Sequence, residues 1–408
     1  IFKEEGKIDS SILVEEANRI FGGTQAEGVY SQKSAYDAME VGINLFLRET
    51  ESPDWNNQDA SWAASKVVEL TEKISRLPTQ SRRDGEMEEF QQFSTPPPLA
   101  FAANWVANIT SIDTVMEPQA GTGDLAIWAD IVGAKVVLNE LSKRRTELLE
   151  ALFPDAQIFQ ENAEQLNNVL PDSVQPSVIV MNPPFSATAG RVQGKRNSFV
   201  GARHVEQALK RVQDNGRIVA IVGQGMGHDR ATFRDWWKDI ESKYNVRADI
   251  GVSGHEYRKY GTTFSNRILV IDKTGPTLEP VLIDNVDSVA ELPHLLEGIK
   301  NERVQRTQQA STQSTSQTNI GAKSPTIQSK RGVGNNSPNQ PRNVERPVGD
   351  PGTRRTGITV GETPRAPNNG NGIDDGIRTG GELSVGSVGE RDDGGSRSAD
   401  LGRDNSDD

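Results

Sequence analysis

Residues 114–129 read TVMEPQAGTGDLAIWA, and this stretch decides the fold class. An apolar strand over 114–116 runs into a turn that contains Gly121 and Gly123, and a helical pattern begins near Asp124. Glycine has no Cβ atom, so the backbone at such a turn can approach a ligand closely. In doubly wound sheets, ligands bind at the carboxyl ends of the strands. The position of the turn favours a ligand site over an ordinary tight turn.

The rest of the region alternates between β-rich runs and helical patterns. Six further strands are predicted, at 135–138, 157–159, 177–181, 217–222, 246–252 and 267–271. Strands that alternate with helices indicate a mostly parallel sheet with helices on both faces. A polar stretch joins the last two strands, which predicts an antiparallel pair at the edge. The expected fold is therefore α/β and Rossmann-like, a doubly wound seven-stranded sheet with an antiparallel edge strand.

A second motif, SVIVMNPPF, covers residues 177–185. An apolar strand ends at Asn182, and Pro183, Pro184 and Phe185 follow. The prolines stiffen the backbone and have no N–H group. The side-chain carbonyl of Asn182 and the main-chain carbonyl of Pro183 can together accept both hydrogens of an exocyclic amine. Phe185 can then stack on a planar ring; the alternative is a tight turn with a buried Phe.

Glu140 ends the second strand, about twenty residues after the glycines, and suits the two hydroxyl groups of a ribose. The turn does not read G-x-G-x-x-G, which makes a dinucleotide less suitable as the ligand. No Gly-Lys-Ser/Thr follows, so the turn is not a nucleotide-phosphate loop.

The sequence E-P-x-A-G-T-G followed by N-P-P-F resembles the S-adenosylmethionine-dependent N6-adenine DNA methyltransferases, in their gamma order of motifs. The segment FSTP at 93–96 is similar to the one that opens this family's fold and touches the methionine end of the cofactor. The stretches NPPFSATAGRVQGKRN, ARHVEQAL and YGTTFSNRILV resemble methylase modules of phage and plasmid proteins. Those modules are coupled to a strawberry-notch-like helicase, as in defence-against-restriction proteins. The resemblance covers roughly residues 30–275.

The resemblance implies S-adenosyl-L-methionine as the cofactor and methyl transfer to the N6 amine of an adenine flipped out of DNA. It implies that Glu140 holds the ribose hydroxyls and that Leu141 covers the cofactor adenine. Asn162 stands where the family usually has Asp, and it keeps an acceptor oxygen for the adenine amine. The remaining cofactor-binding residues implied are Thr95, Glu117, Ala120, Gly121, Gly123 and Asn182. The catalytic group implied is Asn182, Pro183, Pro184 and Phe185.

Two other functions stay open. The same chemistry suits the amine of an RNA adenine or the amide of a protein glutamine. Glutamine methylases usually carry Asn-Pro-Pro-Tyr, so Phe185 favours nucleic acid. The third possibility is a non-catalytic S-adenosylmethionine-binding module of a larger helicase–methylase, and the intact Asn-Pro-Pro-Phe speaks against it.

Charge argues against binding of nucleic acid by bulk attraction. The chain has a formal net charge of −12, and residues 301–408 are neutral, with 14 basic and 14 acidic residues. The negative charge therefore lies on residues 1–300. A local basic loop with Arg191, Lys195 and Arg196, followed by Arg203, is predicted to contact phosphates rather than to be plain solvated surface. A second basic and aromatic cluster at 257–260 is either a contact or plain surface.

We expect a helical N-terminal region over 1–90, a methyltransferase domain over 91–275, a short packing segment over 276–300 and a disordered tail or linker over 301–408. The N-terminal region is predicted to be a small helical bundle or, alternatively, a clamp over the substrate or a partner. Residues after Phe264 include no Phe, Trp or Tyr, so the tail cannot form a core. Trp236 and Trp237 are predicted to be a core-facing pair on a helix.

Composition sets further limits. The chain has no Cys and only four His, so we expect no disulfide and no metal site. No run of 18 apolar residues is present, and the first residues do not resemble a signal peptide or begin with Met. We therefore expect a fragment or processed piece of a longer cytoplasmic protein without a membrane contact. Its expected partners are DNA, or alternatively RNA, and a helicase domain in the same or another chain.

Overall fold

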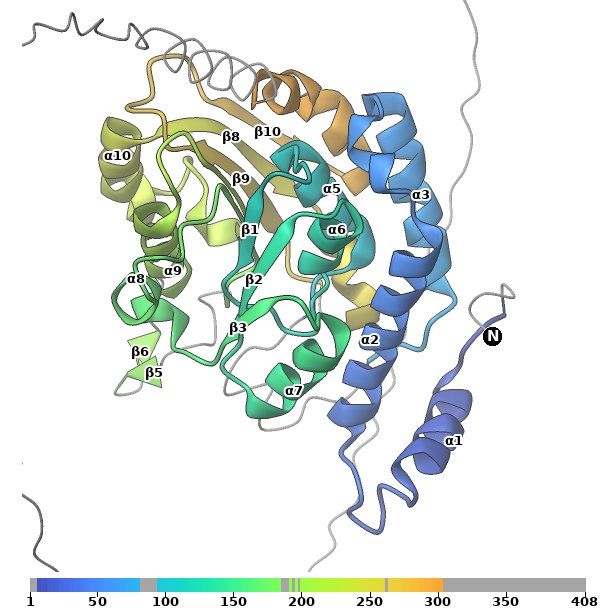
Figure 1. Ribbon diagram of the computed structural model, residues 1–408. Coiled ribbons are helices and arrows are strands. Elements are labelled where there is room, and N and C mark those ends of the chain that lie inside the picture. Colours follow the sequence, from blue (N-terminus) through green and yellow to red (C-terminus); the bar gives the residue numbers. More distant parts are fainter. Residues whose placement is uncertain are drawn as a thin grey trace, which may run out of the picture. The chain divides into compact units, whose positions relative to one another are not determined.

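The computed structural model describes residues 6–80, 94–184, 191–192, 195–196, 199–260 and 263–303. Their centre is an eight-stranded sheet with the order β10-β8-β9-β7-β4-β1-β2-β3 (Figure 1). The strands are β1 (Thr114–Glu117), β2 (Lys135–Asn139), β3 (Gln157–Phe159), β4 (Val178–Met181), β7 (Arg217–Gly223), β8 (Asn245–Val252), β9 (Asn266–Asp272) and β10 (Leu282–Val286).

The sheet is parallel except for β9, which pairs antiparallel with both β7 and β8. The predicted fold class, a doubly wound α/β sheet with a mostly parallel order, is confirmed. The antiparallel pair β8–β9 is also present. An eighth strand, β10, extends the sheet beyond β8 and runs parallel to it. Most of β10 is exposed, so it lacks the apolar pattern that would have predicted a strand at 282–286.

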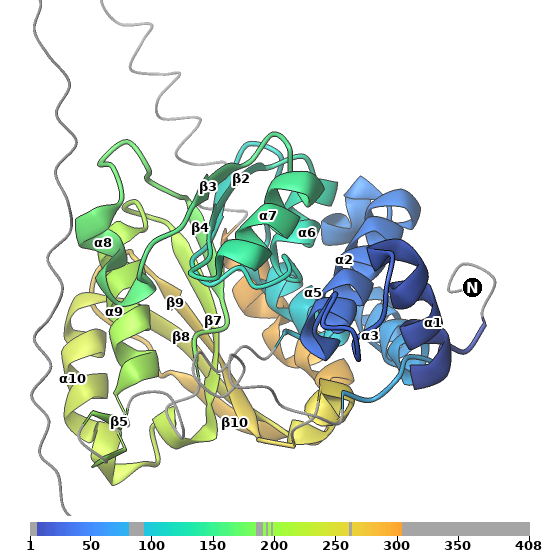
Figure 2. The ribbon, with the colours of Figure 1, turned by 90° about the horizontal axis from the view of Figure 1, so that it is seen from below.

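Helices cover both faces of the sheet, as Figures 1 and 2 show. Along β4 and β7, alternate residues pack into two separate cores, for example Val180 on one face and Ile179 on the other. One face carries α2 (Gln32–Thr50), α3 (Ala60–Ser75), α5 (Pro97–Ala107), α6 (Ala126–Ile131) and α7 (Lys143–Leu152). The other carries α8 (Leu166–Val169), α9 (Val200–Arg211) and α10 (Arg234–Lys243). Trp236 and Trp237 are buried on α10, as predicted.

The N-terminal helices α1 (Ser10–Phe21), α2 and α3 begin at the side-chain caps Asp9, Ser31 and Asp59. They belong to the same compact unit as the sheet. Buried ion pairs join α2 to α7. Asp37 is fully buried and contacts Lys33 Nζ at 2.5 Å and Arg145 Nη2 at 3.2 Å.

The C-terminal end of the described chain also packs on the core. A helical stretch runs through residue 303, three residues past the expected boundary at 300. Arg303 is buried there and its Nη2 contacts Asp113 Oδ1 at 2.6 Å. The amide of Asn108 donates to the Lys300 carbonyl at 2.9 Å. Within the described ranges, none of the helices combines the length and apolar character needed to cross a membrane.

Candidate active site

The loop between β1 and α6, residues 118–125, is called the glycine loop below. Gly121 and Gly123 have φ angles of +55° and +90°, a region that favours glycine. A Cβ at Gly121 would lie 3.6 Å from Arg145 Nη1, which is an ordinary contact. A Cβ at Gly123 would lie only 2.5 Å from a ring carbon of Phe153. Gly123 is therefore required both by its backbone conformation and by its packing against Phe153, whereas Gly121 is required by its backbone conformation.

Glu140 meets the glycine loop where β2 ends. Its Oε2 accepts from the Gly121 N–H at 2.8 Å, and its Oε1 accepts from the Ser142 N–H at 2.8 Å. The structure thus brings together two predicted cofactor-binding residues that are 19 positions apart in the sequence. Each carboxylate oxygen has a second lone pair that remains for a ligand hydroxyl. Beside it, the Leu141 side chain is 47% exposed.

Asn139 joins the ends of three strands, a role that the sequence did not predict. Its Nδ2 donates to the carbonyls of Pro118 at 2.9 Å and Glu161 at 3.0 Å. Its Oδ1 accepts from the Glu161 N–H at 2.9 Å. Asn162 follows directly, is exposed, and accepts from the Glu164 N–H at 2.9 Å. This network sets Asn162 at the same edge of the sheet as the glycine loop.

Glu117, at the end of β1, is buried and directed at a helix. Its Oε2 accepts from the Ala126 N–H at 2.8 Å, at the beginning of α6. Burial raises the pKa of the Glu117 carboxyl well above its usual value, and the nearby carboxyl of Asp124 raises it further through charge repulsion. Ala120, also predicted at the cofactor, is buried and donates its N–H to the Asn139 carbonyl at 2.9 Å.

Asn182 follows β4, the strand that pairs with β1 on the side opposite β2. Its Nδ2 donates to Thr95 Oγ1 at 3.0 Å and to the Tyr257 hydroxyl at 3.1 Å. Both amide hydrogens are therefore engaged, and Oδ1 has no hydrogen-bond partner among the residues that the structure describes. Pro183 is buried and Pro184 half-buried, whereas Phe185 lies outside the described residues.

Tyr257 belongs to the 3-10 turn η6 (Gly254–Tyr260), between β8 and β9. Its side chain is buried, and this burial raises the pKa of its phenol above the usual value. Tyr260 is buried as well. The sequence allowed a plain surface at 257–260, and for the two tyrosines that interpretation is wrong. Their neighbour Arg258 is exposed.

The glycine loop also contacts α9, which covers the other face of the sheet, through His204. Gln119 Nε2 lies 2.7 Å from His204 Nδ1. Burial lowers the pKa of His204 to about 4, so the neutral imidazole accepts from the Gln119 amide. Gln119 Oε1 is buried and has no hydrogen-bond partner in the described part of the chain. A ligand N–H or O–H group can satisfy this acceptor.

The predicted phosphate-binding residues are described only in part. The backbones of Arg191, Lys195 and Arg196 form a short hairpin of β5 (Arg191–Val192) and β6 (Lys195–Arg196). Their side chains lie outside the described part. Arg203 is exposed on the first turn of α9. The structure thus leaves the contact of this loop with phosphate as a prediction.

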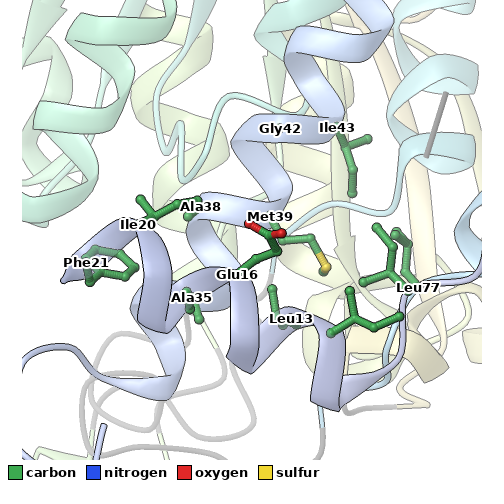
Figure 3. A pocket seen from close by; sticks show the side chains of 13 residues that line it. Leu13, Glu16, Ile20, Phe21, Ala35, Ala38, Met39, Gly42, Ile43 and Leu77 are labelled. Atoms are coloured by element: carbon green, nitrogen blue, oxygen red, sulfur yellow. The ribbon is translucent and has the colours of Figure 1, made fainter. Parts of the chain in front are cut away.

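A cavity of about 270 Å³ lies elsewhere, between α1 and α2 (Figure 3). Figure 3 shows Ile20 and Phe21 of α1 and Met39 of α2 among the side chains that line it. Its lining is apolar except for Glu16 and includes none of the residues predicted to bind the cofactor or the base. Among the described residues, no group of His, Asp and Glu is arranged to hold a metal ion.

No family model matches the chain, and no curated protein matches it either. Solved structures similar to it include a proposed class I S-adenosylmethionine-dependent methyltransferase from Listeria monocytogenes. The two chains are 14% identical, the match covers 70% of this chain and 90% of that chain, and the TM-score is 0.41. The methyltransferase subunit of a type I restriction-modification system from Streptococcus thermophilus has 12% identity, coverages of 51% and 52%, and a TM-score of 0.40.

The modification subunit of a proposed type I restriction enzyme from Vibrio vulnificus has 15% identity, coverages of 53% and 49%, and a TM-score of 0.39. This chain thus spans about half the length of the two restriction-system subunits. At such identities and scores, the function has to be inferred from the site residues.

Proposed function

We propose that this chain transfers a methyl group from S-adenosylmethionine to the N6 amine of adenine in DNA. The observation that supports this most directly is the hydrogen bonding of the Asn182 side chain. Thr95 and Tyr257 accept from its amide hydrogens, so its oxygen, which has no hydrogen-bond partner among the described residues, is held at the carboxyl end of β4. An oxygen fixed in this way is an acceptor for an amine hydrogen.

The residues around the glycine loop fit the proposed cofactor. Gly121 presents backbone without a side chain, Glu140 keeps acceptor capacity for ribose hydroxyls, and Leu141 offers an exposed apolar surface for an adenine ring. Gln119 adds a buried acceptor that lacks a partner within the described ranges. When bound, S-adenosylmethionine supplies an electrophilic methyl group.

The chain's own part of the chemistry is to orient and activate the amine. An adenine amine is a weak nucleophile because its lone pair is delocalised into the ring. Asn182 Oδ1 and the Pro183 carbonyl would accept its two hydrogens, favour a more tetrahedral nitrogen and localise the lone pair. The same two oxygens would stabilise the positive charge that develops on nitrogen. Correct orientation of the amine supplies a large share of the acceleration.

Access to the base is the remaining part of the proposal. An adenine inside a duplex cannot reach Asn182, so it would have to be flipped out, with Phe185 stacked on its ring. The hairpin with Arg191, Lys195 and Arg196, together with Arg203, would hold phosphates. A helicase domain, in the same or another chain, would be a partner that exposes single-stranded DNA.

The test is methyl transfer from tritiated S-adenosylmethionine to DNA, RNA and protein, with the wild-type chain and with Asn182→Ala. We expect adenine in DNA to be labelled. Asn182→Ala should lower the rate by about two to three orders of magnitude, the scale for removal of one transition-state hydrogen bond. Cofactor affinity should change only a few-fold. Labelling confined to RNA or to protein glutamine would assign the substrate to one of the alternatives, and near wild-type transfer by Asn182→Ala would make the motif structural.

A further inference from the structure

Helix α2 contacts the glycine loop through two buried polar side chains. Asn44 Nδ2 donates to the Thr122 carbonyl at 3.0 Å and to Asp124 Oδ1 at 3.1 Å. Thr122 lies between the two glycines whose φ angles are positive. The peptide group between Thr122 and Gly123 is thereby fixed at both ends, because the Gly123 N–H donates to the Ala120 carbonyl at 2.7 Å.

Glu40 lies one helical turn before Asn44, on the same face of α2. Its Oε2 accepts from Thr122 Oγ1 at 3.1 Å and from Ser94 Oγ at 2.6 Å. Ser94 immediately precedes Thr95, which accepts from Asn182. A single carboxyl group of α2 is therefore connected both to the glycine loop and to the segment that supports Asn182.

These contacts exceed what docking of α2 requires. The helix already packs on the core through Ile43 and Leu47, and Arg48 Nε contacts Asp130 Oδ2 of α6 at 2.7 Å. Burial of a carboxyl and an amide costs free energy unless their hydrogen bonds are specific. An apolar residue at either position would dock the helix without that cost. The polar pair instead restrains the loop whose conformation depends on left-handed glycines.

We propose that α2 is a positioning element of the cofactor site, in which Glu40 and Asn44 hold the glycine loop in its binding conformation. Helix α2 is then a component of the site rather than part of a separate accessory bundle. This inference rests on the proposed function only in that the ligand of the loop is S-adenosylmethionine. The restraint of the loop itself does not depend on the ligand.

The experiment uses the full chain with Asn44→Ala and, as a matched control on the same helix, Arg48→Ala. Calorimetry measures the affinity for S-adenosylmethionine, and hydrogen–deuterium exchange measures the opening of residues 118–125 in the free protein. Asn44→Ala should weaken binding about tenfold, the scale expected when one or two hydrogen bonds are removed. It should also accelerate exchange in the loop. Arg48→Ala should lower the melting temperature but leave affinity within about twofold and loop exchange unchanged.

Two further variants, both at Glu40, separate the effect of its hydrogen bonds from the effect of its charge. Glu40→Gln keeps an acceptor oxygen for Ser94 and Thr122, so it should weaken binding less than Glu40→Ala. Equal effects of Asn44→Ala and Arg48→Ala, or loop exchange unchanged in Asn44→Ala, would overturn the inference. If the wild-type chain fails to bind S-adenosylmethionine, the proposed function is wrong, and the exchange measurement still decides whether α2 restrains the loop.

Discussion

The hydroxyl of Tyr257 accepts a hydrogen bond from Asn182 Nδ2 at 3.1 Å, across 75 positions of the sequence. Tyr257 comes from the turn between β8 and β9, whereas Asn182 follows β4. Two strands, β7 and β9, separate β4 from β8 in the sheet. The orientation of the proposed amine acceptor is therefore set by a residue from a distant part of the sheet.

Tyr257→Phe should slow methyl transfer by about tenfold or more, because the Asn182 carboxamide loses one of its two supports and its oxygen is less well oriented. Cofactor affinity should be unchanged. Tyr260→Phe is the matched control, because Tyr260 is also buried in η6. Tyr260 does not support Asn182, since both amide hydrogens of Asn182 are donated to Thr95 and Tyr257. Single-turnover kinetics with both variants would check this. Equal rates for the two would show that Tyr257 does not position the acceptor.

Gly121 and Gly123 should respond differently to alanine. Gly121→Ala has room for its Cβ, so its main cost is about 1–2 kcal/mol of left-handed backbone strain, and we expect weaker cofactor binding with a small loss of stability. Gly123→Ala would overlap the Phe153 ring and should lower the melting temperature more. Calorimetry and thermal denaturation of both variants measure the difference. Unchanged cofactor affinity in Gly121→Ala, or in the larger Gly121→Val, would remove the basis for a ligand at this turn.

Asp124→Asn should change how stability depends on pH. Burial and the neighbouring Glu40 raise the pKa of Asp124 to about 7, from a usual value of 3.8. A raised pKa means that the protonated carboxyl stabilises the fold; this contribution is fully present below the usual pKa of 3.8 and is lost as the pH rises from there to about 7. The variant should therefore melt near the wild-type temperature at about pH 4 and above it at about pH 8. Scanning calorimetry at both pH values would reveal it, and a difference independent of pH would contradict the expectation.

Replacement of Arg191, Lys195 and Arg196 by Ala should weaken DNA binding and reduce its salt dependence. The slope of the logarithm of the binding constant against the logarithm of the salt concentration should fall by roughly one for each phosphate that the variant no longer neutralises. Cofactor affinity should not change. A chain that ends at residue 303 is the comparison, because Arg303 is paired with Asp113 and has to be kept. This shortened chain should bind DNA like the full chain. Loss of binding on shortening, with normal binding by the triple variant, would place the nucleic-acid surface in the tail.

Much of the sheet could be predicted from local pattern, because buried parallel strands are short apolar runs bounded by turn residues. The positions of β1, β2, β4, β7 and β9 follow the predicted runs closely. Strand β10 could not be predicted in this way, since three of its five residues are exposed. Its place in the sheet comes from pairing with β8, which is not visible in its own sequence.

The site could be predicted only where neighbouring residues carry a motif. The glycine loop, Glu140 and Asn182 could be singled out as candidates because short sequence patterns mark strand ends. No sequence motif identifies Glu40, Asn44 or Tyr257. Their roles depend on contacts with residues that are 75 to 82 positions away in the sequence. In the sequence, a buried acidic residue of an amphipathic helix cannot be told from a solvent-exposed one until its partners in the fold are known.

The ion pairs of Asp37 have a consequence for cooperativity. If α2 separated from the sheet while the rest stayed folded, Arg145 would lose its main ionic partner, Asp37. Such a state costs about 3–5 kcal/mol, so it should be scarcely populated. The described helices and sheet should therefore unfold in a single equilibrium transition, with tryptophan fluorescence and far-ultraviolet dichroism giving the same midpoint. In this molecule, burial of charge couples the N-terminal helices to the sheet as one folding unit.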